Sequence, residues 1–104
     1  MIDRVKIGDI EYTVRLERDG EYDGSVTHSI AIIQIAPDMH PIVERCSLWH
    51  EIFHAIFKQT GQEDARQNEG LIEALSHSVV AIIRNNPELV EYTCGGHDVQ
   101  VGNG

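Results

Sequence analysis

The chain has 104 residues, 41% of them hydrophobic, which is enough for one compact domain with a modest core. Its 17 acidic residues outnumber 8 basic ones, and the formal charge of −9 argues against a nucleic-acid partner or an acidic membrane surface. No apolar stretch approaches the roughly 20 residues that a membrane span requires. Cys46 and Cys94 do not form a CxxC pair, which favours a reducing, cytoplasmic setting. We therefore expect a single domain over residues 1–104.

The first third of the chain has the alternating pattern of β-strands. In residues 9–17, DIEYTVRLE, every second residue is apolar, so that one face of the strand carries Ile10, Tyr12, Val14 and Leu16. Gly8-Asp9 predicts a tight turn before this strand. Residues 18–25, RDGEYDGS, are typical of a loop, and residues 29–36, SIAIIQIA, predict another strand. We expect an antiparallel sheet of about three strands.

The pattern becomes helical after Pro37. Pro41 suits a first helical turn, apolar residues recur with helical spacing over 42–56, and Gly61 suits a C-terminal stop, which predicts a helix over about 41–60. A second helix, with Asp64 as its cap, ends before Pro87. Its expected buried side is Leu71, Ile72, Leu75, Val79, Ile82 and Ile83. Residues 88–92 predict one or two further helical turns. The glycine-rich tail, 95–104, is expected to be loose, with 97–101 as a possible short strand.

The stretch HEIFH, residues 50–54, lies in the first predicted helix. Residues i and i+4 of a helix share a face, so His50 and His54 present two imidazoles that one zinc ion can bridge. Glu51 lies about 100° further around the helix, beside the metal rather than on it. From there its carboxylate can take a proton from a zinc-activated water, as in HExxH metallopeptidases. The alternative is a helix with two partly exposed histidines and a solvated glutamate.

A catalytic zinc site needs a third protein ligand. The second predicted helix carries Glu69, Glu73 and His77 at spacings of four, and an antiparallel turn near residues 61–63 would return positions 69–73 to the level of His50 and His54. Chain counting does not choose between Glu69 and Glu73, and it places His77 about one turn further on. An acidic stripe of this kind is otherwise typical of a solvated helix face.

HEIFH, followed by EGLIEALSHSVVAII, resembles the ImmA/IrrE-type zinc metallopeptidases, especially the short forms of phages and mobile elements. In that gluzincin-like family a helix of pattern ExxA[ND]xFA follows HExxH. The resemblance covers about residues 47–83 and implies a minimal zincin-like α+β domain, with a sheet before the HExxH helix and a second, antiparallel helix. It makes Glu69 the third ligand and Glu73, which stands at the Asn/Asp position, a residue that orients a histidine or an alternative ligand. Ile72, Leu75 and Ser76 replace the remaining motif residues.

These patterns predict a zinc-dependent peptidase with Glu51 as general base, located in the host cytoplasm if phage-encoded. The predicted strand at 30–35 could pair with a peptide or protein substrate as an edge strand. The oxyanion could be stabilised by His28, His77, Tyr92 or His97. Trp49, Phe53 and Phe57 are expected in the core, and Cys46 as a buried, inert thiol. The alternatives are a non-catalytic zinc-binding protein that serves as a binding or assembly module, and a helical interaction domain without metal. The oligomeric state is not indicated.

Overall fold

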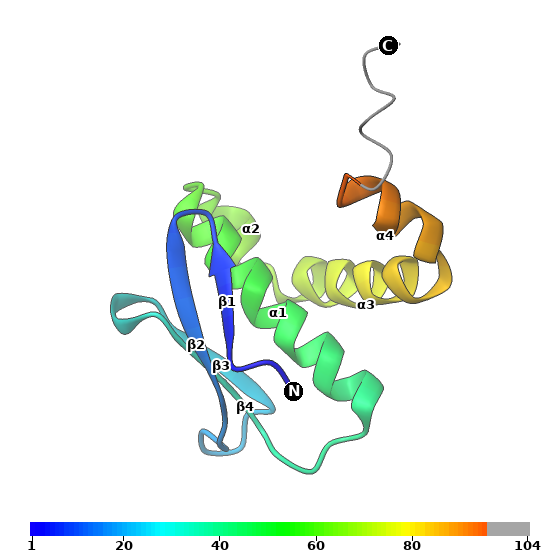
Figure 1. The fold of residues 1–104 in the computed structure, drawn as a ribbon. Helices are drawn as coiled ribbons and strands as arrows, with labels where there is room; N and C mark the ends of the chain where they lie inside the picture. Colours follow the sequence, from blue (N-terminus) through cyan, green and yellow to red (C-terminus); the bar gives the residue numbers. More distant parts are fainter. Residues whose placement is uncertain (96–104) are drawn as a thin grey trace.

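A mixed four-stranded sheet forms one side of the protein in the computed structural model, which describes residues 1–95 (Figure 1). The strands are β1 (Arg4–Ile7), β2 (Ile10–Leu16), β3 (Gly24–Thr27) and β4 (Ile32–Ile35). Their order is β1-β2-β4-β3, with β4 parallel to β2 and antiparallel to β3. The α+β class is confirmed. The strand considered for 97–101 lies outside the described residues.

The sheet has four strands where about three were predicted, and the pairing of β2 with β4 is parallel where an antiparallel sheet was expected. The chain passes from β2 to the far edge, forms β3, turns through the 3-10 helix η1 (His28–Ile30), and returns as β4 between β3 and β2. β3 includes Gly24 and Ser25, which the sequence had placed in a loop. A four-residue strand that begins with Gly-Ser has too little hydrophobic alternation to be recognised.

The core lies between the sheet and the helix α1 (Pro41–Gln59), which packs on one face of the sheet (Figure 1). Tyr12 and Val14 of β2 are buried in it, as predicted, whereas Ile10 and Leu16 at the ends of the strand are exposed. The other buried members of this cluster are Ile7, Ile33, Ile35, Ile52 and Ala55. Since α1 carries the HExxH residues, this packing fixes their position against β3 and β4.

The first helix has the predicted limits. Pro41 is its first residue, and the Nδ1 atom of His40 accepts the backbone N–H of Ile42 at 3.1 Å, which caps the start of the helix. Gly61 has the positive φ of +71° that is common after a helix C-terminus. Trp49, Phe53 and Phe57 form a ladder of rings with centroids 6.0 and 6.1 Å apart. These rings are half-buried rather than fully enclosed.

The second predicted helix is two helices, α2 (Glu63–Gln67) and α3 (Glu69–Asn85). Asn68 separates them, and its side-chain oxygen accepts the backbone N–H of Leu71 at 3.0 Å, so that Asn68 and not Asp64 caps α3. The short helix α4 (Pro87–Thr93) follows Pro87, as predicted. No helix in the described part of the chain has both the length and the apolar character to cross a membrane.

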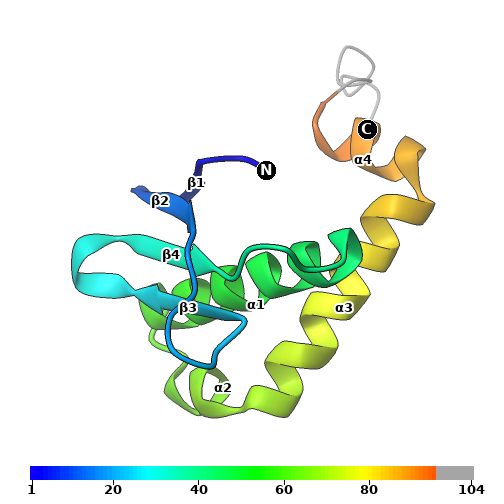
Figure 2. The ribbon, with the colours of Figure 1, turned by 90° about the horizontal axis from the view of Figure 1, so that it is seen from below.

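The buried side of α3 is narrower than predicted. Ile72 and Val80 are buried, whereas Leu71, Ile82 and Ile83 keep 39, 48 and 38% of their surface exposed. For Ile82 and Ile83 the reason is that α3 runs back across α1 obliquely, and its C-terminal half projects beyond α1 (Figures 1 and 2). The N-terminal end of α3 is therefore held next to the HExxH residues, while its other end leaves apolar side chains uncovered.

Candidate metal centre

His50, His54 and Glu69 form a group that could hold a metal ion, with one ligand atom from each residue within 4.8 Å of the others. The two histidines lie one turn apart on α1, with ring centroids 5.1 Å apart, and Glu69 is the first residue of α3. The Glu69 carboxylate bridges the rings: Oε2 lies 2.8 Å from His50 Nε2, and Oε1 lies 3.1 Å from His54 Nε2. The convergence predicted from the helical spacing is present.

The geometry of this group suits a small cation. Ligands of tetrahedral zinc, about 2.0–2.2 Å from the ion, are separated from one another by about 3.3 Å. The distances of 2.8 and 3.1 Å between the Glu69 oxygens and the histidine Nε2 atoms are slightly shorter. A small movement of the Glu69 side chain away from the histidines would therefore make room for the ion. Burial lowers the pKa of His54, which favours the neutral imidazole that binds metal. Two imidazoles and one carboxylate are the donor set of many catalytic zinc sites.

Glu73 lies behind His50 instead of beside Glu69. Its Oε2 atom is 2.9 Å from His50 Nδ1, and its Oε1 atom is 2.8 Å from His77 Nε2. With both oxygens engaged, Glu73 orients His50 so that Nε2 faces the metal position, which is the usual role of a carboxylate behind a metal-bound histidine. Of the two glutamates that chain counting left open, Glu69 is therefore the one that joins the histidine pair.

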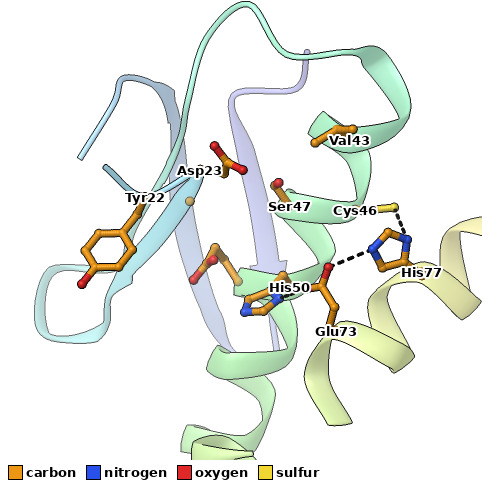
Figure 3. Close-up of a pocket in the computed structure, with 10 residues that line it drawn as sticks. Tyr22, Asp23, Val43, Cys46, Ser47, His50, Glu73 and His77 are labelled. Carbon is orange, nitrogen blue, oxygen red and sulfur yellow. Dashed lines mark hydrogen bonds and ion pairs between the residues drawn. The ribbon is translucent and has the colours of Figure 1, made fainter. Parts of the chain in front are cut away.

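A chain of hydrogen bonds continues from Glu73 to a buried thiol (Figure 3). His77 Nδ1 is 3.5 Å from the Sγ atom of Cys46, and burial raises the pKa of this thiol, so the thiol donates and Nδ1 accepts. His77 Nε2–H then donates to Glu73, and these hydrogen bonds from His77 and His50 lower the pKa of the Glu73 carboxyl. The network keeps Glu73 ionised and fixed. His77 thus acts through Glu73 on His50 and is not a ligand in this arrangement.

Glu51 is the buried acid of the site, with only 6% of its surface exposed. Burial raises its pKa from the ordinary 4.5 to about 7, an effect that His50 opposes and Glu69 reinforces. Its side chain lies against Gly24 of β3, where a Cβ atom would come within 3.0 Å of Glu51 Oε2. Gly24 therefore makes room for this carboxylate, a role that the sequence pattern had not revealed.

A hollow of about 260 Å³ opens beside the site. His50, Glu51, Glu73 and His77 line it, whereas His54 and Glu69 do not. Figure 3 shows Tyr22 and Asp23, from the segment leading into β3, across the hollow from α1 and α3. Sequence reasoning missed these two residues because they lie in a stretch read as a loop. Only the return of the chain through β3 brings them opposite the HExxH helix.

Two other residues considered for the oxyanion, His28 and Tyr92, do not line this hollow. His28 lines a different hollow with Tyr12 and Lys58, and Tyr92 lies on α4 with 65% of its surface exposed. His97 lies outside the described residues. The predicted edge strand is also corrected: residues 32–35 form the interior strand β4, and the edge next to the site is β3.

Searches against protein-family models, curated proteins and solved structures find no match for this chain. The assignment of a function therefore depends on the chemistry of the side chains described above. Their arrangement provides three metal ligands, a buried carboxylate next to them, and an open hollow bounded by a sheet edge.

Proposed function

We propose that this chain is a zinc-dependent metallopeptidase of the ImmA/IrrE type, in which His50, His54 and Glu69 hold the metal. The observation that carries the proposal is the convergence of these ligand atoms next to the buried Glu51, beside a hollow that His50 and Glu51 line. A purely structural zinc site has no need of a buried carboxylate next to its ligands, and it closes its fourth position with another protein ligand.

Glu51 is the proton carrier in the proposed reaction. Zinc, when bound, activates water and polarises the peptide carbonyl. Glu51 accepts one proton from the attacking water as the new C–O bond forms, and donates it to the amine nitrogen as the C–N bond breaks. As a carboxylate buried beside the metal ligands, Glu51 can act first as base and then as acid within one reaction cycle.

We propose that an extended substrate binds along the free edge of β3. The backbone N–H of Ala36 donates to the carbonyl of Asp23, and hydrogen-bonded pairs alternate along antiparallel strands. The backbone groups of Gly24 and Val26 therefore face away from β4 and are free to pair with a peptide that adds to the sheet. Such a peptide would pass the hollow at Glu51, which lies directly against Gly24.

The test combines metal analysis with hydrolysis of a peptide library. We expect about one zinc per chain, lost in the His50→Ala and His54→Ala variants, and cleavage that Glu51→Gln abolishes while zinc is retained. The expected loss of rate is on the order of 10²- to 10⁴-fold, as for removal of a general base. A protein that takes up no transition metal would refute the proposed site.

The same experiment distinguishes the peptidase from the main alternative, a non-catalytic zinc-binding module. Full zinc occupancy with no cleavage of any peptide, and no difference between the native protein and Glu51→Gln, would favour that module. The identity of the metal is a further outcome, because two histidines and one carboxylate also bind iron in other enzymes.

A further inference from the structure

Two apolar hollows meet on a side of α1 that does not line the metal site. One, of about 180 Å³, lies between α1 and the C-terminal half of α3 and includes Val80 and Ile83. The other, of about 390 Å³, lies between α1 and the N-terminal strand and includes Val5 and Ile7. Leu48 and Trp49 line both, so the two hollows lie next to each other, and we call the pair the α1 trough.

The α1 trough carries positive charge on an otherwise acidic chain. Lys6, Arg45 and Arg84 line it, and no carboxylate of the described residues does. The whole chain, by contrast, has 17 acids and 8 bases. Glu44 lies in an adjoining hollow of about 270 Å³, which Arg45 and Leu48 also line. A segment that fits the trough should therefore combine bulky apolar side chains with carboxylates.

The helix α4 has this chemistry, and among the described residues, 1–95, its main packing partner is α3. It has seven residues, none of them buried, and it packs on α3. Leu89 and Tyr92 keep 47 and 65% of their surface exposed, and Glu88 lies in the first turn. A helix shorter than about 12 residues is marginal without packing against another surface. Figure 2 shows that α4 and the N-terminal segment project on the same side of α1.

We propose that two copies of this chain form a symmetric dimer in which α4 of each copy lies in the α1 trough of the other. Leu89 and Tyr92 would enter the apolar hollows, and Glu88 would approach Arg45 and Arg84. A two-fold axis repeats the contact, so that α4 of each copy would meet the trough of the other.

The test is the mass of the full-length protein in solution, measured by sedimentation over a range of concentrations. We expect a dimer whose dissociation constant rises by at least about tenfold in Leu89→Asp, as for the loss of an interface anchor. The matched control is Leu16→Asp, which alters a similarly exposed leucine on β2, 52% exposed, and should leave the dimer intact. Circular dichroism of each variant verifies that the fold is retained.

A charge exchange tests the orientation of the contact. Arg84→Glu and Glu88→Arg should each weaken the dimer by like-charge repulsion, and the double variant should restore it. A native protein that remains monomeric up to about 1 mM would overturn the proposal. A dimer whose dissociation constant is unchanged in Leu89→Asp would also overturn it, as would a double variant in which dimer formation is not restored. Binding of a foreign acidic peptide by a monomeric protein would overturn it too, by showing a different occupant of the trough. These readouts do not depend on peptidase activity.

Discussion

Replacing Glu51 by glutamine should stabilise the metal-free protein above neutral pH. The carboxyl is buried with a pKa of about 7, whereas an unfolded chain has the ordinary value of 4.5. Folding therefore favours the protonated acid, and burying the ionised form costs free energy. Glutamine has nearly the same shape and no charge, so it removes this cost while it keeps the packing against Gly24.

The size and sign of the effect follow from the two pKa values. Each pKa unit corresponds to about 1.4 kcal/mol, so the difference between 4.5 and about 7 amounts to roughly 3 kcal/mol. The folded-state pKa is higher than the unfolded-state pKa. Below pH 4.5 the carboxyl is therefore protonated in both states, and the contribution of Glu51 to the free energy of unfolding is fully present. It is lost as the pH rises through about 7, and above that pH the native protein bears the full cost.

The assay is urea unfolding of the metal-free protein, with a chelator present, at several pH values between about 4.5 and 8. We expect the free energies of unfolding of the native protein and Glu51→Gln to be similar at the acidic end, and the variant to gain up to about 3 kcal/mol at the alkaline end. Glu17→Gln, at an exposed position after β2, controls for the loss of one negative charge. A difference that does not change with pH, or a native protein that is the more stable one at pH 8, would refute this account of Glu51.

Three further predictions concern the site. Glu73→Ala should weaken zinc binding by about 10- to 100-fold in a competition titration, because His50 loses its Nδ1 partner, and an unchanged affinity would show that Glu73 does not orient the ligand. Gly24→Ala should lower kcat/KM on the order of 10- to 100-fold with zinc retained, because the added Cβ displaces Glu51. Gly70→Ala is the control, since its Cβ would meet only ordinary contacts and should leave kcat/KM unchanged. An equal loss of kcat/KM in both variants would contradict this reason. Single N-methyl groups moved along a cleaved peptide should block cleavage at alternate positions if the substrate pairs with β3, and a uniform effect would exclude such pairing.

Much of the site was determined by the local sequence. The spacing of His50 and His54 on a helix places two imidazoles on one face whatever the rest of the fold does, and Glu51 follows automatically beside them. The helix limits were also readable, because Pro41 and Gly61 act on the backbone within a few residues. The resemblance to ImmA/IrrE-type peptidases depends on the same short motif, and it stays a prediction.

The tertiary structure decided everything that depends on how distant segments meet. Glu69 and Glu73 were equivalent by chain counting, and only the oblique crossing of α3 over α1 places one beside the histidine pair and the other behind His50. β3 and Gly24 were unrecognisable in a loop-like stretch, because an edge strand is defined by its neighbour and not by its own residues. The exposed Ile82 and Ile83 have the same cause: helical periodicity gives the direction of a side chain, but whether another element covers it depends on the packing of the whole chain.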